Sequence, residues 1–384
     1  MATSWGRIFL LYAIGVVAAG QLGVVPPLVP ALQRDLGLSL AAAGMVVSIV
    51  TLVGAVLGLL AGGWCERVGH ARALSIGILI MALAATLCAV ADDANTLLAA
   101  RGLAGVGYLL AVVAGPSLMA GTAEPRHHAF VLSLWGTFVP VGIAVAGLAT
   151  ASFADRAGWR IVFAIDAVVL AFTLIAAIVV VPQSRTAEPV NRHGVAVARL
   201  GSSLPLAVAF FCFTLLFLAL AGLLPAYLVE RRELAADDAG RIAAIATAFG
   251  IAGSLLAGWM MRHGISSGRL AAVGLVASTA IAALCFSAAA PVPLAVVGFA
   301  LSFALGGLVP AAAFASVPLI AASPRAIGPI NGLLAQAGSL GSLAGPPLLA
   351  LWVEWMGWSL APALLLAVAA IGAAAALAIV SPRR

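Results

Sequence analysis

Long apolar runs alternate with short polar segments along the whole chain. The runs cover residues 6–31, 41–64, 72–91, 95–121, 127–152, 158–181, 204–229, 238–261, 269–289, 293–321, 327–352 and 357–380. Each run is long enough to cross a hydrocarbon core about 30 Å thick. Backbone amides in lipid find no water to bond, so they must pair within their own segment, as they do in a helix. The pattern therefore predicts an all-α membrane protein with twelve transmembrane helices.

The composition excludes a soluble globular protein. Hydrophobic residues make up 64% of the chain and charged residues 8%, with a mean hydropathy of +1.19, whereas charged residues make up about 25% of a soluble domain. The 41 glycines and 20 prolines suit membrane helices that pack closely and bend. The four cysteines have no CxxC spacing, so we expect buried free thiols and no metal site.

The arginines are distributed unevenly between the polar segments. With the N-terminus inside the cell, twelve lie in cytoplasmic segments and six in outer loops, while Arg101 lies within a span. Cytoplasmic loops of membrane proteins carry the excess of positive charge. We therefore expect a multi-pass protein of the cytoplasmic (inner) membrane with both termini in the cytoplasm. The net charge of +6 then reflects topology, and no nucleic-acid partner is expected.

The longest polar stretch, residues 182–203, divides the twelve spans into six and six. We expect an N-terminal six-helix bundle over residues 1–181 and a C-terminal six-helix bundle over residues 204–384, joined by this stretch as a cytoplasmic linker. The two halves match in sequence at nearly one offset. Gly62 aligns with Gly258 at an offset of 196, and Gly158-Trp159 aligns with Gly357-Trp358 at 199. Transporters use such internal repeats to build two pseudo-symmetric bundles around a central site.

A charged turn lies between the second and third runs, with the sequence Gly62-Gly63-Trp64-Cys65-Glu66-Arg67-Val68-Gly69-His70-Ala71-Arg72. The first glycine lets a neighbouring helix approach, and Gly69 permits a tight turn. Glu66 at a helix end can pair with an arginine or with the positive N-terminus of an adjoining helix. A pair that forms in one conformation and breaks in another acts as a conformational gate. We assign this role to Gly62, Glu66, Arg67, Gly69 and Arg72; the alternative is that the arginines only anchor the topology.

This turn resembles the signature Gly-x-Leu-Ala-Asp-Arg-x-Gly-Arg-Lys-x-x-Leu of the major facilitator superfamily. Gly62, Arg67, Gly69 and Leu74 match it, and Glu66 keeps the acid, while His70-Ala71 replaces the Arg-Lys pair. The resemblance covers essentially the full length of the chain. It implies a secondary transporter whose two bundles rock about a central site, and whose substrate is a small molecule.

Two charged residues lie within predicted spans, where ionisable side chains are costly and usually functional. Arg101 opens the sequence Arg-Gly-Leu-Ala-Gly-Val-Gly, which is similar to the family's Arg-x-x-Gln-Gly-x-Gly. The resemblance implies that Arg101 takes part in proton coupling; the alternative is that its side chain extends to the outer interface. Asp166 is the only acid within a span. It is the second proton-coupling candidate, and its alternative role is a hydrogen bond to a neighbouring helix.

Other candidates are implied by their positions in the spans. The fifth span, residues 127–152, lacks the glycine that precedes the proline in the family's exporter motif Gly-x-x-x-Gly-Pro-x-x-Gly-Gly. Helix packing and bending are assigned to Gly105, Gly107, Gly136, Pro140, Gly341, Gly345 and Pro346. Spans that line the central cavity in the family supply the candidates for substrate contact, each with packing as its alternative: Gln21, Tyr108, Trp135, Phe303, Phe314, Asn331 and Gln336.

We expect a proton-coupled transporter of a small organic solute that works as a monomer without a cofactor. The chain has no Gly-Lys-Ser/Thr loop for ATP. The largely apolar cavity favours efflux of a lipophilic, drug-like compound by antiport, while Arg101 leaves open the symport of a small organic or inorganic anion. A lipid-modifying enzyme needs paired acids or a metal set within the bilayer, and a sensor needs a larger cytoplasmic domain. Both are remote alternatives, and no catalytic residue is expected.

Overall fold

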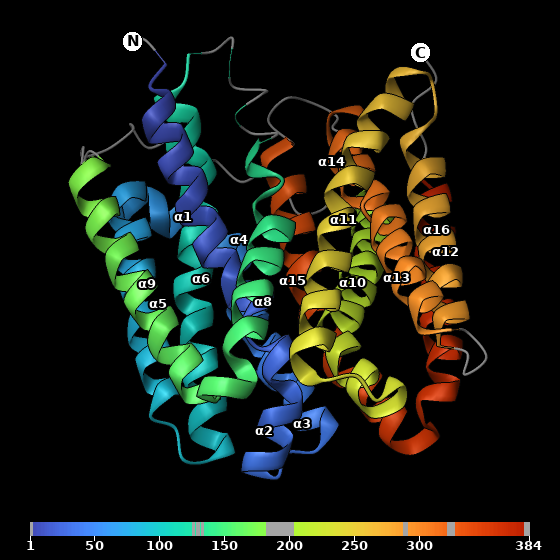
Figure 1. The fold of residues 1–384 in the computed structure, drawn as a ribbon. Helices are drawn as coiled ribbons and strands as arrows, with labels where there is room; N and C mark the ends of the chain where they lie inside the picture. Colours follow the sequence, from blue (N-terminus) through green and yellow to red (C-terminus); the bar gives the residue numbers. More distant parts are fainter. Residues whose placement is uncertain are drawn as a thin grey trace.

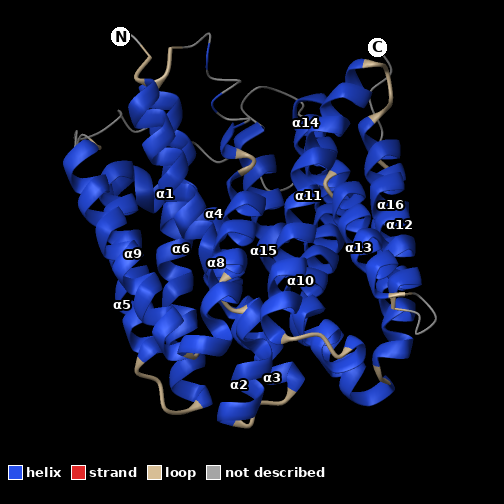
Figure 2. Ribbon diagram, in the orientation of Figure 1, coloured by secondary structure: helices blue, strands red, loops and turns tan. Residues whose placement is uncertain are grey.

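The computed structural model describes residues 3–124, 127, 131, 134–181, 203–286, 291–320 and 327–379. These residues form helices joined by short loops, and Figure 2 shows no strand among them. In the first half of the chain the helices are α1 (Trp5–Gly23), η1 (Pro26–Leu28), α2 (Val29–Leu36), α3 (Leu40–Ser48), η2 (Ile49–Thr51), α4 (Leu52–Val68), α5 (His70–Ala89), α6 (Ala94–Thr122), α8 (Phe138–Ala157) and α9 (Trp159–Val180).

The second half of the chain repeats this organisation. Its helices are α10 (Leu204–Arg232), α11 (Ala236–Arg262), α12 (Ser267–Cys285), α13 (Val292–Gly306), α14 (Leu308–Ile320), α15 (Ile327–Met356), η7 (Trp358–Leu360) and α16 (Ala361–Leu377). In the part of the chain that the structure describes, each of the twelve apolar runs contains one helix or consecutive helices. Ten described segments are long and apolar enough to cross a membrane, and Phe138–Phe153 forms a shorter apolar helix. The predicted all-α membrane fold is confirmed.

Two of the early spans are broken into consecutive helices. In the first, Pro26 and Pro27 lie in the 3₁₀ turn η1 between α1 and α2, because proline lacks the N–H that an α-helix requires. In the second, η2 separates α3 from α4 without any proline or glycine. A stretch of 3₁₀ helix within a longer helix often marks a hinge. Helix α3 is therefore a short segment between a loop and the 3₁₀ segment η2.

Figure 1 shows how the helices are arranged. Helices α1, α5, α6, α8 and α9 stand together on one side, and α10 to α16 stand on the other. The first half of the chain contacts the second mainly through α3 and α4 against α15, and through α8 against α11. The start of α1 and the end of α16 lie on one face, which we call the terminal face, and α2 and α3 lie on the opposite, distal face.

The structural repeat is visible at matching turns. Gly69 and Gly264 both have a positive φ, of 92° and 89°. At the start of the sixth span of each half, an indole N–H donates to a carboxylate at the end of the first: Trp159 Nε1 to Asp35 Oδ2, and Trp358 Nε1 to Glu230 Oε2, both at 3.0 Å. The division of the chain at the linker stays a prediction, because residues 182–202 lie outside the described residues.

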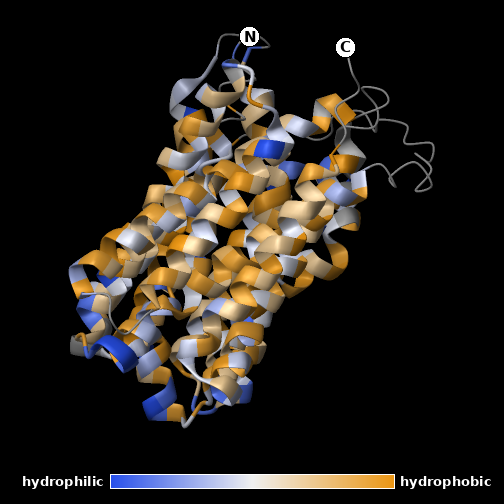
Figure 3. Cartoon of the chain, turned by 90° about the vertical axis from the view of Figure 1, so that its right-hand side faces the viewer, coloured by the Kyte–Doolittle hydropathy of each residue, from blue (hydrophilic) through white to orange (hydrophobic). Residues whose placement is uncertain are grey.

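Large apolar side chains cover the outside of the helices. Phe172 on α9, Leu255 on α11 and Leu284 on α12 are about 70% exposed, at 68%, 68% and 71%. Figure 3 shows apolar residues through the middle of the molecule and polar residues towards its two ends. Soluble proteins rarely expose continuous apolar surface of this kind. These helix faces are the surface that contacts lipid in a multi-pass membrane protein.

Candidate functional site

A buried arginine lies at the centre of a polar network in the first half of the chain. Arg101 is two turns into α6, which Asp93 caps by accepting from the amides of Asn95 and Thr96 at 2.8 and 3.0 Å. The Arg101 side chain is 0% exposed. Its Nη1 donates to Gln21 Oε1 at 3.0 Å, its Nη2 to the Gln21 carbonyl, and its Nε to the Val46 carbonyl at 3.3 Å. The guanidinium thus turns into the helix bundle instead of extending to the interface.

Gln21 joins the two charged residues of the predicted spans. Its carboxamide oxygen accepts from Arg101, and its Nε2 donates to Asp166 Oδ2 at 2.7 Å. The Gln21 side chain is itself 1% exposed. A buried charge is costly unless it is paired and hydrogen-bonded, and here the guanidinium of Arg101 and the carboxyl group of Asp166 are connected through one neutral amide. Three candidates from α1, α6 and α9, chosen for different reasons, lie in one network.

Glycines on α6 allow the neighbouring helices to approach this network. A Cβ on Gly105 would lie 3.0 Å from the carbonyl carbon of Val50 in η2, and one on Gly107 would lie 2.7 Å from Met81 Cγ on α5. Val46 belongs to the last turn of α3, directly before η2. The close packing of α6 on η2 therefore brings the Val46 carbonyl within reach of Arg101. The sequence carries no signal for Val46, because Val46 contributes a backbone atom to the network.

The predicted gate lies at the turn between α4 and α5. Gly69 ends α4 with its N–H donating to the Cys65 carbonyl at 2.9 Å, and its φ of 92° favours glycine. Arg67 and Arg72 are exposed. The surroundings of Gly62 and the side chain of Glu66 lie outside what the structure describes. The gate role of this turn stays a prediction.

The predicted cavity residues occupy different environments. The Trp135 ring is buried between Gly15 and Gly115, whose Cβ positions would come within 2.7 Å of it, and stacks on Phe138 at 4.5 Å. Tyr108 is partly buried, and Phe303 is 3% exposed with its ring 5.6 Å from that of Phe217. Trp135 and Phe303 thus lie within packed regions of the two halves.

The other candidates of the second half are exposed or lie where the two halves meet. Phe314 is 49% exposed, and Asn331 is also exposed. Gln336 Nε2 donates to the Ala55 carbonyl at 2.9 Å, which joins α15 to α4. A cavity of about 20 Å³ lies between α10, α12 and α13, lined in part by Phe303, Ser278, Thr279 and Ser302. This volume has room for a single water molecule.

The glycines and prolines of the eleventh span, α15, lie in close contact with other helices. A Cβ on Gly345 would lie 3.1 Å from the carbonyl carbon of Leu215 on α10, and one on Gly341 would lie 3.0 Å from the Leu215 nitrogen. Pro346 packs against Gly44 of α3, whose Cβ would lie 3.0 Å from the proline carbonyl carbon. In span five, Gly136 lies in a turn and Pro140 in the first turn of α8. Proline is tolerated at that position because the first amides of a helix have no partner within it.

Comparison with known proteins gives the family. The model of the Major Facilitator Superfamily matches residues 11–323. Among solved structures, the chain resembles a bacterial homologue of the human lysosomal transporter Spinster in its inward-facing, unoccupied conformation, with a TM-score of 0.76 and 15% identity over 97% of this chain and 94% of that one. This likeness shows the fold.

Curated relatives match over part of their length. The chain is 30% identical to the puromycin resistance protein pur8 of Streptomyces alboniger over 49% of this chain and 37% of the relative. It is 32% identical to a probable 4-methylmuconolactone transporter of Cupriavidus pinatubonensis, over 35% of this chain and 33% of the relative. It is 28% identical to a gallate transporter of Pseudomonas putida, over 41% of this chain and 35% of the relative. The chain spans about a third of the length of these relatives. With the family match and the fold together, the chain belongs to the major facilitator superfamily and is a membrane transporter rather than an enzyme.

Proposed function

We propose that this protein is a proton-coupled secondary transporter that exports a lipophilic small organic compound by antiport. The observation that carries the proposal is the buried network of Arg101, Gln21 and Asp166. Asp166 is the carboxylate that takes up and releases the proton, and Arg101 is its cationic partner through Gln21. Protons are the coupling ion, and no cofactor takes part.

The charge balance of the network supports proton coupling. With Asp166 ionised, the network holds one positive and one negative charge; when Asp166 is protonated, only the Arg101 charge remains. A buried charge without a partner is strongly unfavourable. Conformations in which Arg101 gains another acceptor or water are therefore favoured on protonation. A protonation event that stabilises one conformation over another shifts their populations, as an ion-driven transporter requires.

The bonding of Arg101 also supports a lipophilic substrate over an anion. Nε, Nη1 and Nη2 all donate to acceptors within the protein, Gln21 and Val46, and the side chain is fully buried. In this conformation the cation is not presented to an anionic solute. Relatives named as puromycin and methylenomycin A resistance proteins are in accord with export of a drug-like compound.

Uptake of a small organic anion by proton symport is the second candidate. The observation that favours it is the presence of a gallate transporter and a probable 4-methylmuconolactone transporter among the relatives. For this alternative, Arg101 would have to leave Gln21 during the cycle to meet the anion. The direction of proton movement separates the two candidates.

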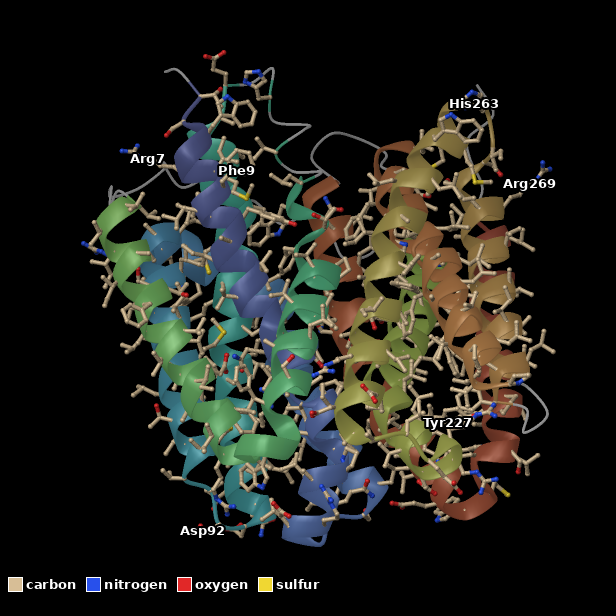
Figure 4. All side chains as sticks on the ribbon, viewed as in Figure 1. Arg7, Phe9, Asp92, Tyr227, His263 and Arg269 are labelled. Atoms are coloured by element: carbon tan, nitrogen blue, oxygen red, sulfur yellow. The ribbon has the colours of Figure 1, made fainter. Side chains whose placement is uncertain are left out.

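The distribution of charge supports an orientation with both termini in the cytoplasm. Figure 4 places Arg7, His263 and Arg269 on the terminal face and Asp92 on the distal face. Positive side chains concentrate on the cytoplasmic side of membrane proteins. In the proposed arrangement the protein lies in the cytoplasmic membrane as a monomer, with the distal face outside.

Proton flux in proteoliposomes tests the proposed function. Purified protein is reconstituted with a pH-sensitive dye in the lumen, and a panel that includes puromycin and gallate is added outside. Antiport predicts that a lipophilic compound added to vesicles with an acidic lumen raises the luminal pH; symport predicts that gallate acidifies an alkaline lumen. Vesicles without protein give the background leak. An absence of protein-dependent proton movement with compounds that are transported would contradict proton coupling.

A further inference from the structure

One hydrogen bond joins the two halves of the molecule at the distal face. The backbone N–H of Ala41, in the first turn of α3, donates to Glu354 Oε1 near the end of α15 at 2.8 Å. The neighbouring amide of Ala42 donates to its own N-cap, Ser39 Oγ, at 3.1 Å. Of these two amides at the N-terminus of α3, one therefore has its acceptor in the adjacent N-cap residue, and the other has its acceptor in a carboxylate 313 residues away.

The electrostatics of this contact favour the arrangement in which the two halves meet at the distal face. A carboxylate is stabilised at a helix N-terminus and destabilised at a helix C-terminus. Glu354 lies two residues before the end of its own helix at Met356, so its own helix provides an unfavourable field. Contact with the first turn of α3 replaces that field with a favourable one. Separation of the halves at the distal face would leave Glu354 without this partner.

Helix α3 is held at both ends. At one end the Ala41 amide contacts Glu354, and at the other the Val46 carbonyl accepts from Arg101 Nε at 3.3 Å. Five residues of α-helix separate these points by about 7.5 Å. Between them, Gly44 packs directly on Pro346 of α15. The 3₁₀ segment η2 follows Ser48 and gives α3 a point about which to move as a unit.

We propose that Glu354 clasps the two halves at the distal face, and that α3 couples this clasp to the Arg101–Gln21–Asp166 network. Movement of Arg101 away from the Val46 carbonyl would release one end of α3 and weaken the clasp at the other. Glu354 is thus a positioning residue for the transport cycle, remote from the proton site. The coupling rests on the proposed function, while the clasp itself does not.

Distances across the distal face test the clasp. Spin labels at Arg34→Cys on α2 and Ser359→Cys in η7 report the separation of the halves, since both positions are exposed and the four native cysteines are buried. Pulsed electron paramagnetic resonance then gives the populations of short and long distances. We expect Glu354→Ala to raise the ratio of the long to the short distances about two- to fivefold, and Glu354→Gln, which keeps an acceptor without the charge, to have a smaller effect in the same direction.

The matched control removes another carboxylate of the distal face. Asp238 on α11 pairs with Arg241 of the same helix at 3.7 Å and joins no other helix in the described contacts. Asp238→Asn is therefore expected to leave the distance distribution unchanged. An unchanged distribution in Glu354→Ala, or an equal change in Asp238→Asn, would overturn the clasp.

The same labels test the coupling through α3. Asp166→Asn alters the charge balance around Arg101 without a change in shape. We expect it to shift the distance distribution in the presence of Glu354, and to shift it less than half as far in the Glu354→Ala background, because residues joined through one element act non-additively. Equal shifts in both backgrounds would overturn the coupling and leave the clasp standing. Normal proton-driven transport by Asp166→Asn would instead overturn the proposed function, whatever the distances show.

Discussion

At the residue scale, the network depends on the neutral side chain between its two charges. The carboxamide oxygen of Gln21 accepts a hydrogen bond from Arg101 Nη1, and its Nε2 donates a hydrogen bond to Asp166 Oδ2. A carboxylate at this position would add a second negative charge, and an apolar residue would leave both charged groups short of a partner. The amide supplies an acceptor and a donor at the same time.

Replacement of Gln21 by leucine should destabilise the protein strongly. Gln21→Leu leaves Arg101 Nη1 and Asp166 Oδ2 without their buried partner, and an unsatisfied charged group costs more than an ordinary lost hydrogen bond. We expect a loss of about 3 kcal/mol in the free energy of unfolding, measured by denaturant titration in detergent. Gln33→Leu, on the partly exposed part of α2, is the control and should change stability little. Equal effects of the two substitutions would contradict the network.

At the element scale, close helix packing positions the site. Helix α6 approaches η2 through Gly105 and α5 through Gly107, while α15 approaches α10 through Gly341 and Gly345. The family resemblance predicts the packing role of Gly105 and Gly107, and the spacing of Gly341 and Gly345 predicts theirs. The sequence does not reveal the break at η2, because Ile49-Val50-Thr51 contains neither proline nor glycine. Tertiary contacts with α6 select the local backbone geometry there.

Two glycines three residues apart on α6 provide a matched test of this packing. A Cβ on Gly105 would collide with the Val50 backbone, whereas one on Gly102 meets nothing within 4 Å. We expect Gly105→Ala to lower the free energy of unfolding by about 1–3 kcal/mol through overpacking. Gly102→Ala should raise it by up to about 1 kcal/mol, because alanine is the better helix former. Destabilisation by both substitutions to the same extent would contradict the packing of α6 on η2.

At the scale of the whole molecule, sequence and structure differ in what each reveals. The twelve runs predicted the helices because the thickness of a bilayer fixes the length of an apolar span. Arg101 and Asp166 were identifiable because charged residues within spans are rare. Their connection through Gln21 was not, because residues far apart in the sequence meet only through the packing of α1, α6 and α9. Glu354 could not be identified from the sequence, because an acid near the end of a span is what any exposed helix end can carry.

The two halves share a structural repeat but differ in the charges that their spans carry. Both halves have the indole-to-carboxylate bond at the start of their sixth span, which ties that helix to the first. Arg101 and Asp166 lie within the spans of the first half only, and no span of the second half carries an arginine or an acid at a matching depth in the described residues. The first half is therefore the one that responds to protons in the proposed mechanism, and α3 and α15 carry that response to the second.

The role of Asp166 as the proton site is tested most directly by comparing two modes of transport in Asp166→Asn. Once a substrate is known, proteoliposomes measure its exchange between equal internal and external concentrations, and its accumulation driven by a pH gradient. We expect Asp166→Asn to retain exchange and to lose gradient-driven accumulation, because alternating access remains while the proton site is gone. Accumulation at the wild-type level by Asp166→Asn would contradict this role.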